Sequence, residues 1–197
     1  MRTKQQVVSE FRREAILNAA RSVFAGKGFA RGVIDEIAKE AAVAKGTVYL
    51  YFASKQEIYR AVLDRDMEFL KRTSLERIDA AQGLKEKIRA FALVRLENSE
   101  AKREFFRIMD TEAASVTFTR SQYRNWLGDP VLRLANAIER ASLAGEIRAV
   151  AAERTAWAIA DMTRGLIQRR LLGRADTIPS DDAEFLVDLI WAALEKR

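Results

Sequence analysis

The chain has 197 residues, enough for one large domain or two small ones, and its 49% hydrophobic content with only two prolines favours an all-α protein. It contains neither cysteine nor histidine, which excludes thiolate and Ser-His catalysis and the usual zinc sites. No apolar run approaches the roughly 18 residues of a membrane span, and the polar residues 1–6 do not suggest a secretory signal. We therefore expect a cytoplasmic protein without a cofactor or metal.

The positive charge is concentrated in the first third of the chain. Residues 1–60 hold eleven Lys or Arg and six Asp or Glu, a net charge of +5, whereas residues 61–197 have a net charge of only +1. A basic segment attached to a near-neutral body indicates that the segment contacts a polyanion, although a solvated charged surface would give the same count.

Apolar periodicity predicts helices along the whole chain. A first helix is expected at 9–25, ending at Gly26 and Gly28, followed by two short helices at 33–40 and 45–51. Ser54 and Glu57 have the spacing of a capping box that begins a fourth helix, which extends to residue 80. Further helices are expected at 84–99, 102–116, 121–127, 130–144, 153–172 and 181–196, with Asp129 and Pro130 beginning one of them.

The last predicted helix is apolar on almost every side. Between Phe185 and Leu194 only Asp188 is polar, and a helix apolar all round is usually buried all round. Burial inside a monomer is one solution, and pairing of the last two helices with a second copy is the other. We expect a homodimer whose interface residues are Trp157, Arg164, Ile167, Phe185, Leu189 and Trp191.

The two short helices with a tight turn between them have the proportions of a helix-turn-helix. In the second of them Val48 and Phe52 can pack inward. The other side chains, together with a lysine at the start of the next helix, offer cations and hydroxyl groups for phosphates and base edges. The candidate DNA-binding residues are Lys45, Gly46, Thr47, Tyr49, Tyr51 and Lys55. Each of these residues taken alone also fits ordinary packing.

The same segment resembles a known family. The stretches at 15–20, 23–29 and 36–41, then Lys45-Gly46-Thr47-Val48-Tyr49-Leu50-Tyr51-Phe52 and Ser54-Lys55, are similar to the DNA-binding domain of the tetracycline-repressor (TetR/AcrR) family. The resemblance covers about residues 10–65. It implies a helix-turn-helix domain at 1–53, a helical ligand-binding and dimerisation domain at 54–197, and about nine helices in all. It also implies a repressor that a small-molecule effector releases from a pseudo-palindromic operator.

The chain departs from the family pattern at the starts of both short helices. Gly32 and Val33 stand where the family usually has a Thr or Ser at the start of the second helix, and Ala44 stands where a Ser often precedes the lysine. The missing hydroxyl groups remove helix caps worth about 0.5–2 kcal/mol each.

The effector residues are the least determined by the sequence. Aromatic and flexible side chains of the body fit an apolar or amphipathic ligand, although plain core packing explains any one of them. The candidates are Phe91, Arg95, Phe105, Met109, Trp126 and Met162. Arg95 would favour a ligand with a carboxylate, or it pairs with Glu97, Glu104 or Glu112.

Two other functions stay open at this point. One is a helical interaction or ligand-binding protein that does not bind DNA, which the missing hydroxyl groups would suit. The other is an all-α enzyme that uses the carboxylates Glu97, Glu104 and Glu112, although their spacing matches no known metal site. We consider the DNA-binding regulator better supported, because charge placement, helix spacing and the resemblance agree.

Overall fold

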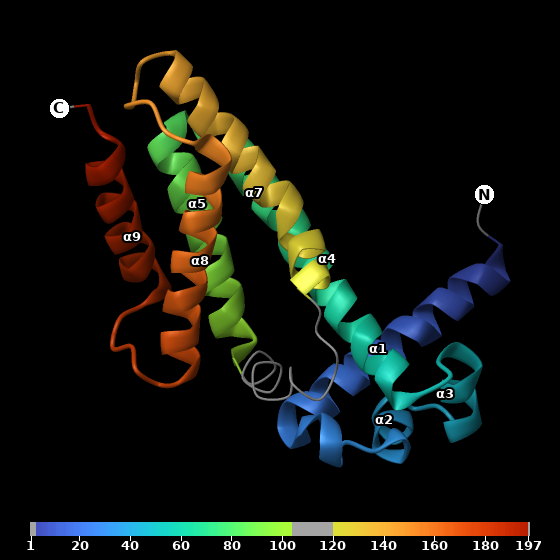
Figure 1. Ribbon diagram of the computed structural model, residues 1–197. Helices are drawn as coiled ribbons and strands as arrows, with labels where there is room; N and C mark the ends of the chain where they lie inside the picture. Colours follow the sequence, from blue (N-terminus) through green and yellow to red (C-terminus); the bar gives the residue numbers. More distant parts are fainter. Residues whose placement is uncertain (1–2, 104–119, 197) are drawn as a thin grey trace. The chain divides into compact units, whose positions relative to one another are not determined.

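The computed structural model describes residues 3–103 and 120–196, and all regular structure in these ranges is α-helical, as predicted (Figure 1). The helices are α1 (Lys4–Arg31), α2 (Ile34–Glu40), α3 (Lys45–Tyr51), α4 (Lys55–Ala80), α5 (Gly83–Ala101), α7 (Arg120–Leu143), α8 (Ala152–Leu171) and α9 (Pro179–Leu194). The described residues form two compact units, 3–67 and 68–103 with 120–196, so α4 contributes to both. The division into domains at 1–53 and 54–197 stays a prediction. Among these helices, none combines the length and apolar composition needed to cross a membrane.

Helix α1 is longer at both ends than the sequence predicts. It begins at Lys4 because Thr3 forms a capping box: Thr3 Oγ1 accepts the N–H of Gln6 at 3.2 Å, and Gln6 Oε1 accepts the N–H of Thr3 at 2.9 Å. The expected end at Gly26 is also wrong. Gly28, with φ of 80°, kinks the chain, and one more turn continues to Arg31.

Helix α4 begins where the sequence predicts, with a variation on the expected capping box. Ser54 Oγ accepts the N–H of Glu57 at 3.1 Å, whereas the Glu57 carboxylate accepts the N–H of Ala53, at 2.6 Å. The helix ends at Ala80, and the chain turns at Gly83, whose φ of 73° is in the left-handed region.

The second unit contains a core formed by the inward faces of α5, α7, α8 and α9 together with the end of α4. α8 and α9 lie side by side at the C-terminal end of the chain (Figure 1). The largest fully buried side chains of this core are Phe91, Ile78, Ile88, Leu96, Leu134 and Ile138.

Helix α7 runs through the point where the sequence predicts a break. The expected helices at 121–127 and 130–144 are one helix, with Pro130 inside it. Asp129 does not act as an N-cap there, because its carboxylate pairs with Lys71 of α4 at 2.5 Å. Pro130 and Val131 are buried, so tertiary packing outweighs the backbone hydrogen bond that proline cannot donate.

Candidate nucleic-acid interface

Helices α2 and α3 are joined by the sharp turn that a helix-turn-helix needs. Ala42 has φ of 53°, in the left-handed region, and the N–H of Val43 donates to the carbonyl of Ala38 at 3.0 Å. The turn spans residues 41–44, so the two helices run in different directions and only one face of α3 can contact the rest of its unit.

The inward face of α3 is the one that the sequence predicts. Val48 is fully buried and Phe52, the C-cap residue, is 3% exposed. The same unit contains an aromatic cluster in which the Phe24 and Tyr59 rings meet edge-on with centroids 5.3 Å apart, and Phe29 lies 5.0 Å from Tyr59. This rigid core fixes the direction in which the rest of α3 points.

The outward face of α3 carries the predicted polar side chains and one apolar side chain that the sequence analysis missed. Lys45, Gly46 and Tyr49 are exposed, and Thr47 and Tyr51 are half-buried. Leu50 is 83% exposed, the same fraction as the most exposed leucine of the second unit. The sequence could have predicted this exposure, because a residue two positions after the inward Val48 lies on the opposite face of the helix. An apolar side chain on this face suits contact with a thymine methyl group in a major groove.

Lys45 is paired within its own unit. Its ammonium lies 2.8 Å from the carboxylate of Asp35 in α2, and this hydrogen bond, with the negative charge of Asp35, raises the pKa of Lys45 above its ordinary value. Both side chains are exposed. Lys45 therefore stays protonated at neutral pH, and Asp35 places a negative charge beside the outward face of α3.

Lys55, unlike the candidates on α3, is engaged by backbone carbonyl groups of its own unit. Its ammonium donates to three backbone carbonyl groups at the end of α1, those of Phe29 at 2.8 Å, Ala30 at 3.1 Å and Gly32 at 3.1 Å. It also lies 4.6 Å from the centroid of the Phe29 ring. An ammonium group has three donors, and all three are used here. Lys55 therefore fastens the start of α4 to the segment that precedes α2.

Helices α2 and α3 begin without the side-chain caps that hydroxyl groups would give them. Val33 and Ala44, the N-cap residues of α2 and α3, make no side-chain cap hydrogen bond. A side chain at Gly32 would be in tight contact with α1, since an added Cβ would lie 3.0 Å from Cδ1 of Phe24 and 3.2 Å from the carbonyl oxygen of Gly28. Gly32 thus packs closely against α1.

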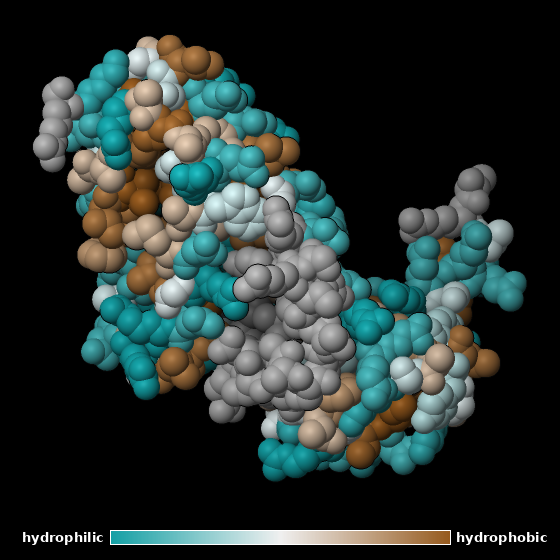
Figure 2. Space-filling view, in the orientation of Figure 1, coloured by the Kyte–Doolittle hydropathy of each residue, from teal (hydrophilic) through white to brown (hydrophobic). Residues whose placement is uncertain are grey.

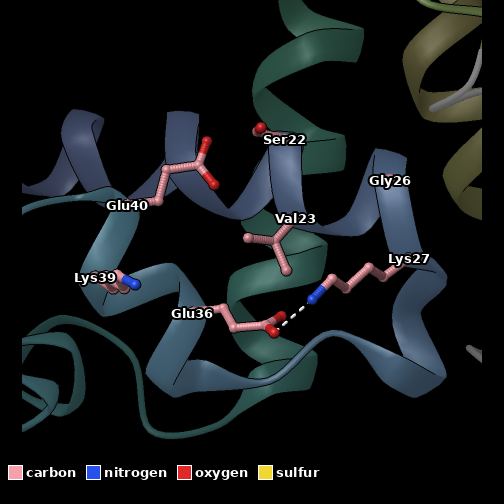
Figure 3. Close-up of a pocket in the computed structure, with 7 residues that line it drawn as sticks. All are labelled: Ser22, Val23, Gly26, Lys27, Glu36, Lys39 and Glu40. Carbon is pink, nitrogen blue, oxygen red and sulfur yellow. Dashed lines mark hydrogen bonds and ion pairs between the residues drawn. The ribbon is translucent and has the colours of Figure 1, made fainter.

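An open pocket of about 500 Å³ lies between α1 and α2 (Figure 3). Lys27 of α1 and Glu36 of α2 form an ion pair across it. Its lining residues are Ser22, Val23, Gly26, Lys27, Glu36, Lys39 and Glu40. With two lysines and two glutamates it has no net charge, and it is separate from the predicted effector residues.

The predicted effector residues are only partly within the described ranges. Phe91 and Arg95 of α5 are both buried, and the Arg95 guanidinium lies 5.0 Å from the Phe91 ring centroid. Met162 packs against the core that contains Phe91, and Trp126 is half-buried. Phe105 and Met109 lie outside the described residues. The carboxylate of Glu97, a suggested partner of Arg95, pairs with Arg77 at 2.6 Å.

The predicted dimer residues divide into two groups. Phe185 and Leu189 of α9 are 62% and 47% exposed, and Arg164 of α8 is exposed too. The other three, Trp157, Ile167 and Trp191, are half-buried against the core of the second unit. Figure 2 shows apolar side chains exposed on the unit that contains α8 and α9.

Comparison with known proteins gives one consistent answer. Residues 16–62 match the model of bacterial regulatory proteins of the tetR family. This segment of the chain therefore matches the DNA-binding domain of the TetR family. Over 50 residues it is 46% identical to the A-factor receptor protein of Streptomyces griseus, and over 59 residues it is 44% identical to the transcriptional activator FasR of Mycolicibacterium smegmatis. These matches span 25% and 30% of this chain and only 18% and 27% of the relatives.

The fold of the whole chain is also that of TetR-family regulators. A TetR-family transcription regulator from Marinobacter aquaeolei VT8 superposes with a TM-score of 0.72 over 99% of this chain and 100% of the other, at 22% sequence identity. The relatives and neighbours are transcription regulators rather than enzymes. In the described ranges of this chain, no group of three acidic side chains is placed to bind a metal ion.

Proposed function

We propose that this chain is a homodimeric, cytoplasmic transcription repressor of the TetR family. It inserts α3 of each copy into the major groove of a pseudo-palindromic operator and is released by a small-molecule effector. The main support for this proposal is the exposed outward face of α3. Two buried residues of one helix face, Val48 and Phe52, hold α3 on its unit and leave Tyr49 and Leu50 exposed. The net charge of +5 in residues 1–60 supplies attraction to phosphates.

The side chains of α3 have different roles in this proposal. Gly46 allows close approach to the duplex, since open space surrounds the position of an added Cβ. Leu50 contacts a thymine methyl group, and the polar residues contact phosphates and base edges. These polar residues are Lys45, Thr47, Tyr49 and Tyr51. Lys55 enters the proposal as a positioning residue, because its donors are engaged by carbonyl groups at the end of α1.

Exposed residues of α8 and α9 support a dimer. Phe185 and Leu189 project from α9, while the exposed side of α8 includes the small residues Ala158 and Gly165. A Cβ added at Gly165 would meet no atom within 4 Å, so a helix of a second copy can approach there. Burying a side chain the size of Phe185 contributes about 1.5–3 kcal/mol, and a two-fold interface buries it twice.

Light scattering on the purified chain tests the dimer. We expect the wild type to have the mass of two chains and the variant Phe185→Ser/Leu189→Ser to have the mass of one. The control is Leu132→Ser, because Leu132 of α7 is 54% exposed and lies on another helix. A monomeric wild type would refute the dimer.

Helix α4 supports a response to an effector bound in the second unit. It begins four residues after α3 ends and forms ion pairs with α7 through Lys71 and Asp129, and with α5 through Arg77 and Glu97. An effector that moves α5 or α7 therefore displaces the helix that follows α3. Such a displacement changes the spacing of the two copies of α3, which adjacent major grooves fix at about 34 Å.

DNA selection followed by binding measurements tests the function. The full chain is used to select duplexes from a random library, and fluorescence anisotropy then measures its affinity for the enriched sequence at several salt concentrations. We expect steep salt dependence, and a loss of about tenfold or more for Tyr49→Ala and for Leu50→Ala. Leu143→Ala is the matched control, since Leu143 is also 83% exposed. No enrichment, or equal affinities for all variants, would refute DNA reading by α3.

Repression is tested separately with a promoter that overlaps the selected duplex. A reporter gene is expected to be silenced by the wild type and expressed with Tyr49→Ala. Activation in this assay would refute the repressor role, an outcome that deserves a test because one relative, FasR, is a transcriptional activator.

A further inference from the structure

The first turns of α1 extend beyond the core of their unit. All side chains from Thr3 to Glu14 are exposed, although the segment is helical and capped at its start. Residues 4–14, the N-terminal extension, also precede the segment 16–62 that matches the family model. Helices this exposed gain little stability from packing, so the extension needs another explanation.

Two arginines continue the buried face of α1 into this extension. Arg12 and Arg13 stand four residues before Ile16 and Leu17, which are fully buried in the core of the unit. Residues four apart lie on the same face of a helix. The side of α1 that packs inward at Ile16 and Leu17 therefore becomes a basic, hydrogen-bonding side one turn earlier.

A direct contact shows where this side points. The guanidinium of Arg13 lies 5.3 Å from the centroid of the Phe52 ring, and Phe52 is the residue that ends α3. The basic side of the extension thus begins next to the C-terminal end of α3. From Arg13 the helix continues to Lys4, a length of roughly 14 Å at a rise of about 1.5 Å per residue.

The charges of the extension favour a polyanion. Among the described residues, Lys4 and Arg12 take part in no ion pair. Glu14, which follows Arg13 in the chain, is neutralised by Arg65 of α4, with 3.0 Å between Nη1 and Oε2. Asn18 accepts a second hydrogen bond from the same guanidinium at 2.9 Å, which fixes α1 against α4.

We infer that the N-terminal extension is a second DNA-binding element, which contacts phosphates of the same duplex beside the groove occupied by α3 through Arg12 and Arg13. The inference rests on the proposed function, since the duplex is placed by α3. Lys4 adds a third cation farther along the extension. Contacts of this kind do not depend on base sequence, so the extension contributes affinity and salt dependence and leaves the choice of sequence to α3.

The salt dependence of DNA affinity tests this element. The full chain is titrated with a fluorescent mixed-sequence duplex of about 40 base pairs, from about 50 to about 200 mM salt. Each phosphate contact contributes about 0.9 to the slope of log affinity against log salt. We expect Arg12→Ala/Arg13→Ala to reduce that slope by about 1.8, and Arg12→Ala alone, which keeps the Arg13 contact with Phe52, to reduce it by about 0.9. The matched control is Arg140→Ala on α7, an exposed cation of the second unit, which is expected to leave the slope unchanged.

The outcomes separate this inference from the proposed function. If the wild type shows no salt-dependent binding and Tyr49→Ala does not change affinity for the selected duplex, the proposed function fails. If Tyr49→Ala weakens binding while the arginine variants keep the wild-type slope, only the inference fails. The exposed apolar residues Val7, Val8 and Phe11 offer another occupant, a second copy of the chain. A lower mass of Val7→Ser/Phe11→Ser in light scattering, with an unchanged salt slope for the arginine variants, would overturn the inference in favour of that contact.

Discussion

Replacing Lys55 by methionine distinguishes a positioning lysine from a phosphate-binding one. Methionine keeps much of the apolar stem beside the Phe29 ring and removes the ammonium that donates to the carbonyl groups of Phe29, Ala30 and Gly32. Hydrogen bonds that involve a charged group contribute about 1.5–3 kcal/mol each, but one of these three is exposed and water replaces it. The cation-π contact adds about 0.5–1 kcal/mol.

We therefore expect Lys55→Met to lower the free energy of unfolding by about 2–4 kcal/mol, less than the sum because the ammonium regains solvation on unfolding. For a chain of this length each 1 kcal/mol shifts Tm by about 2–4 °C, so the decrease in Tm is about 4–16 °C. Circular dichroism during heating measures it. Hydrogen exchange of the Gly32 amide, which donates to Gly28, reports the loosening locally.

The control is Lys39→Met, because Lys39 is an exposed lysine of the same unit. A Lys55→Met protein with unchanged Tm and with a salt slope of DNA binding reduced by about 0.9 would refute the positioning role. It would show instead that the lysine leaves the carbonyl groups to bind a phosphate.

Three further predictions concern other contacts. Gly32→Ala places a Cβ 3.0 Å from the Phe24 ring, and urea unfolding is expected to show a free energy of unfolding lower by about 1–3 kcal/mol. Gly26→Ala, with open space around the added Cβ, is expected to raise it by up to about 1 kcal/mol, and equal effects of the two variants would contradict the packing argument. Asp35→Asn removes the carboxylate that raises the pKa of Lys45, so NMR is expected to show a lower pKa of Lys45 and fluorescence anisotropy a tighter binding of DNA. Weaker DNA binding would show instead that the ion pair orients Lys45. Arg170→Met leaves the buried carboxylate of Asp182 without the guanidinium 2.8 Å away and is expected to lower the free energy of unfolding by about 3–5 kcal/mol. The double variant Arg170→Met/Asp182→Leu is expected to recover most of this loss, and no recovery would show that the unpaired carboxylate does not cause it.

Much of the interface follows from the sequence alone, because its determinants are local. Inward Val48 and Phe52 are four residues apart, and that spacing predicts which side of α3 is buried. The start of α4 is equally local, since Ser54 caps an N–H three residues away. The resemblance to TetR-family regulators is carried by the same short segment and is confirmed by the family match.

Other features depend on partners far apart in the chain, and only the tertiary structure decided them. Lys55 finds its carbonyl groups at the end of α1, more than twenty residues earlier, so its position in the sequence predicted a phosphate contact and the fold gave it a different partner. Asp129 and Pro130 have the local pattern of a helix start. Lys71 and the core of the second unit keep α7 continuous through them, because a long-range ion pair and burial outweigh a local capping preference.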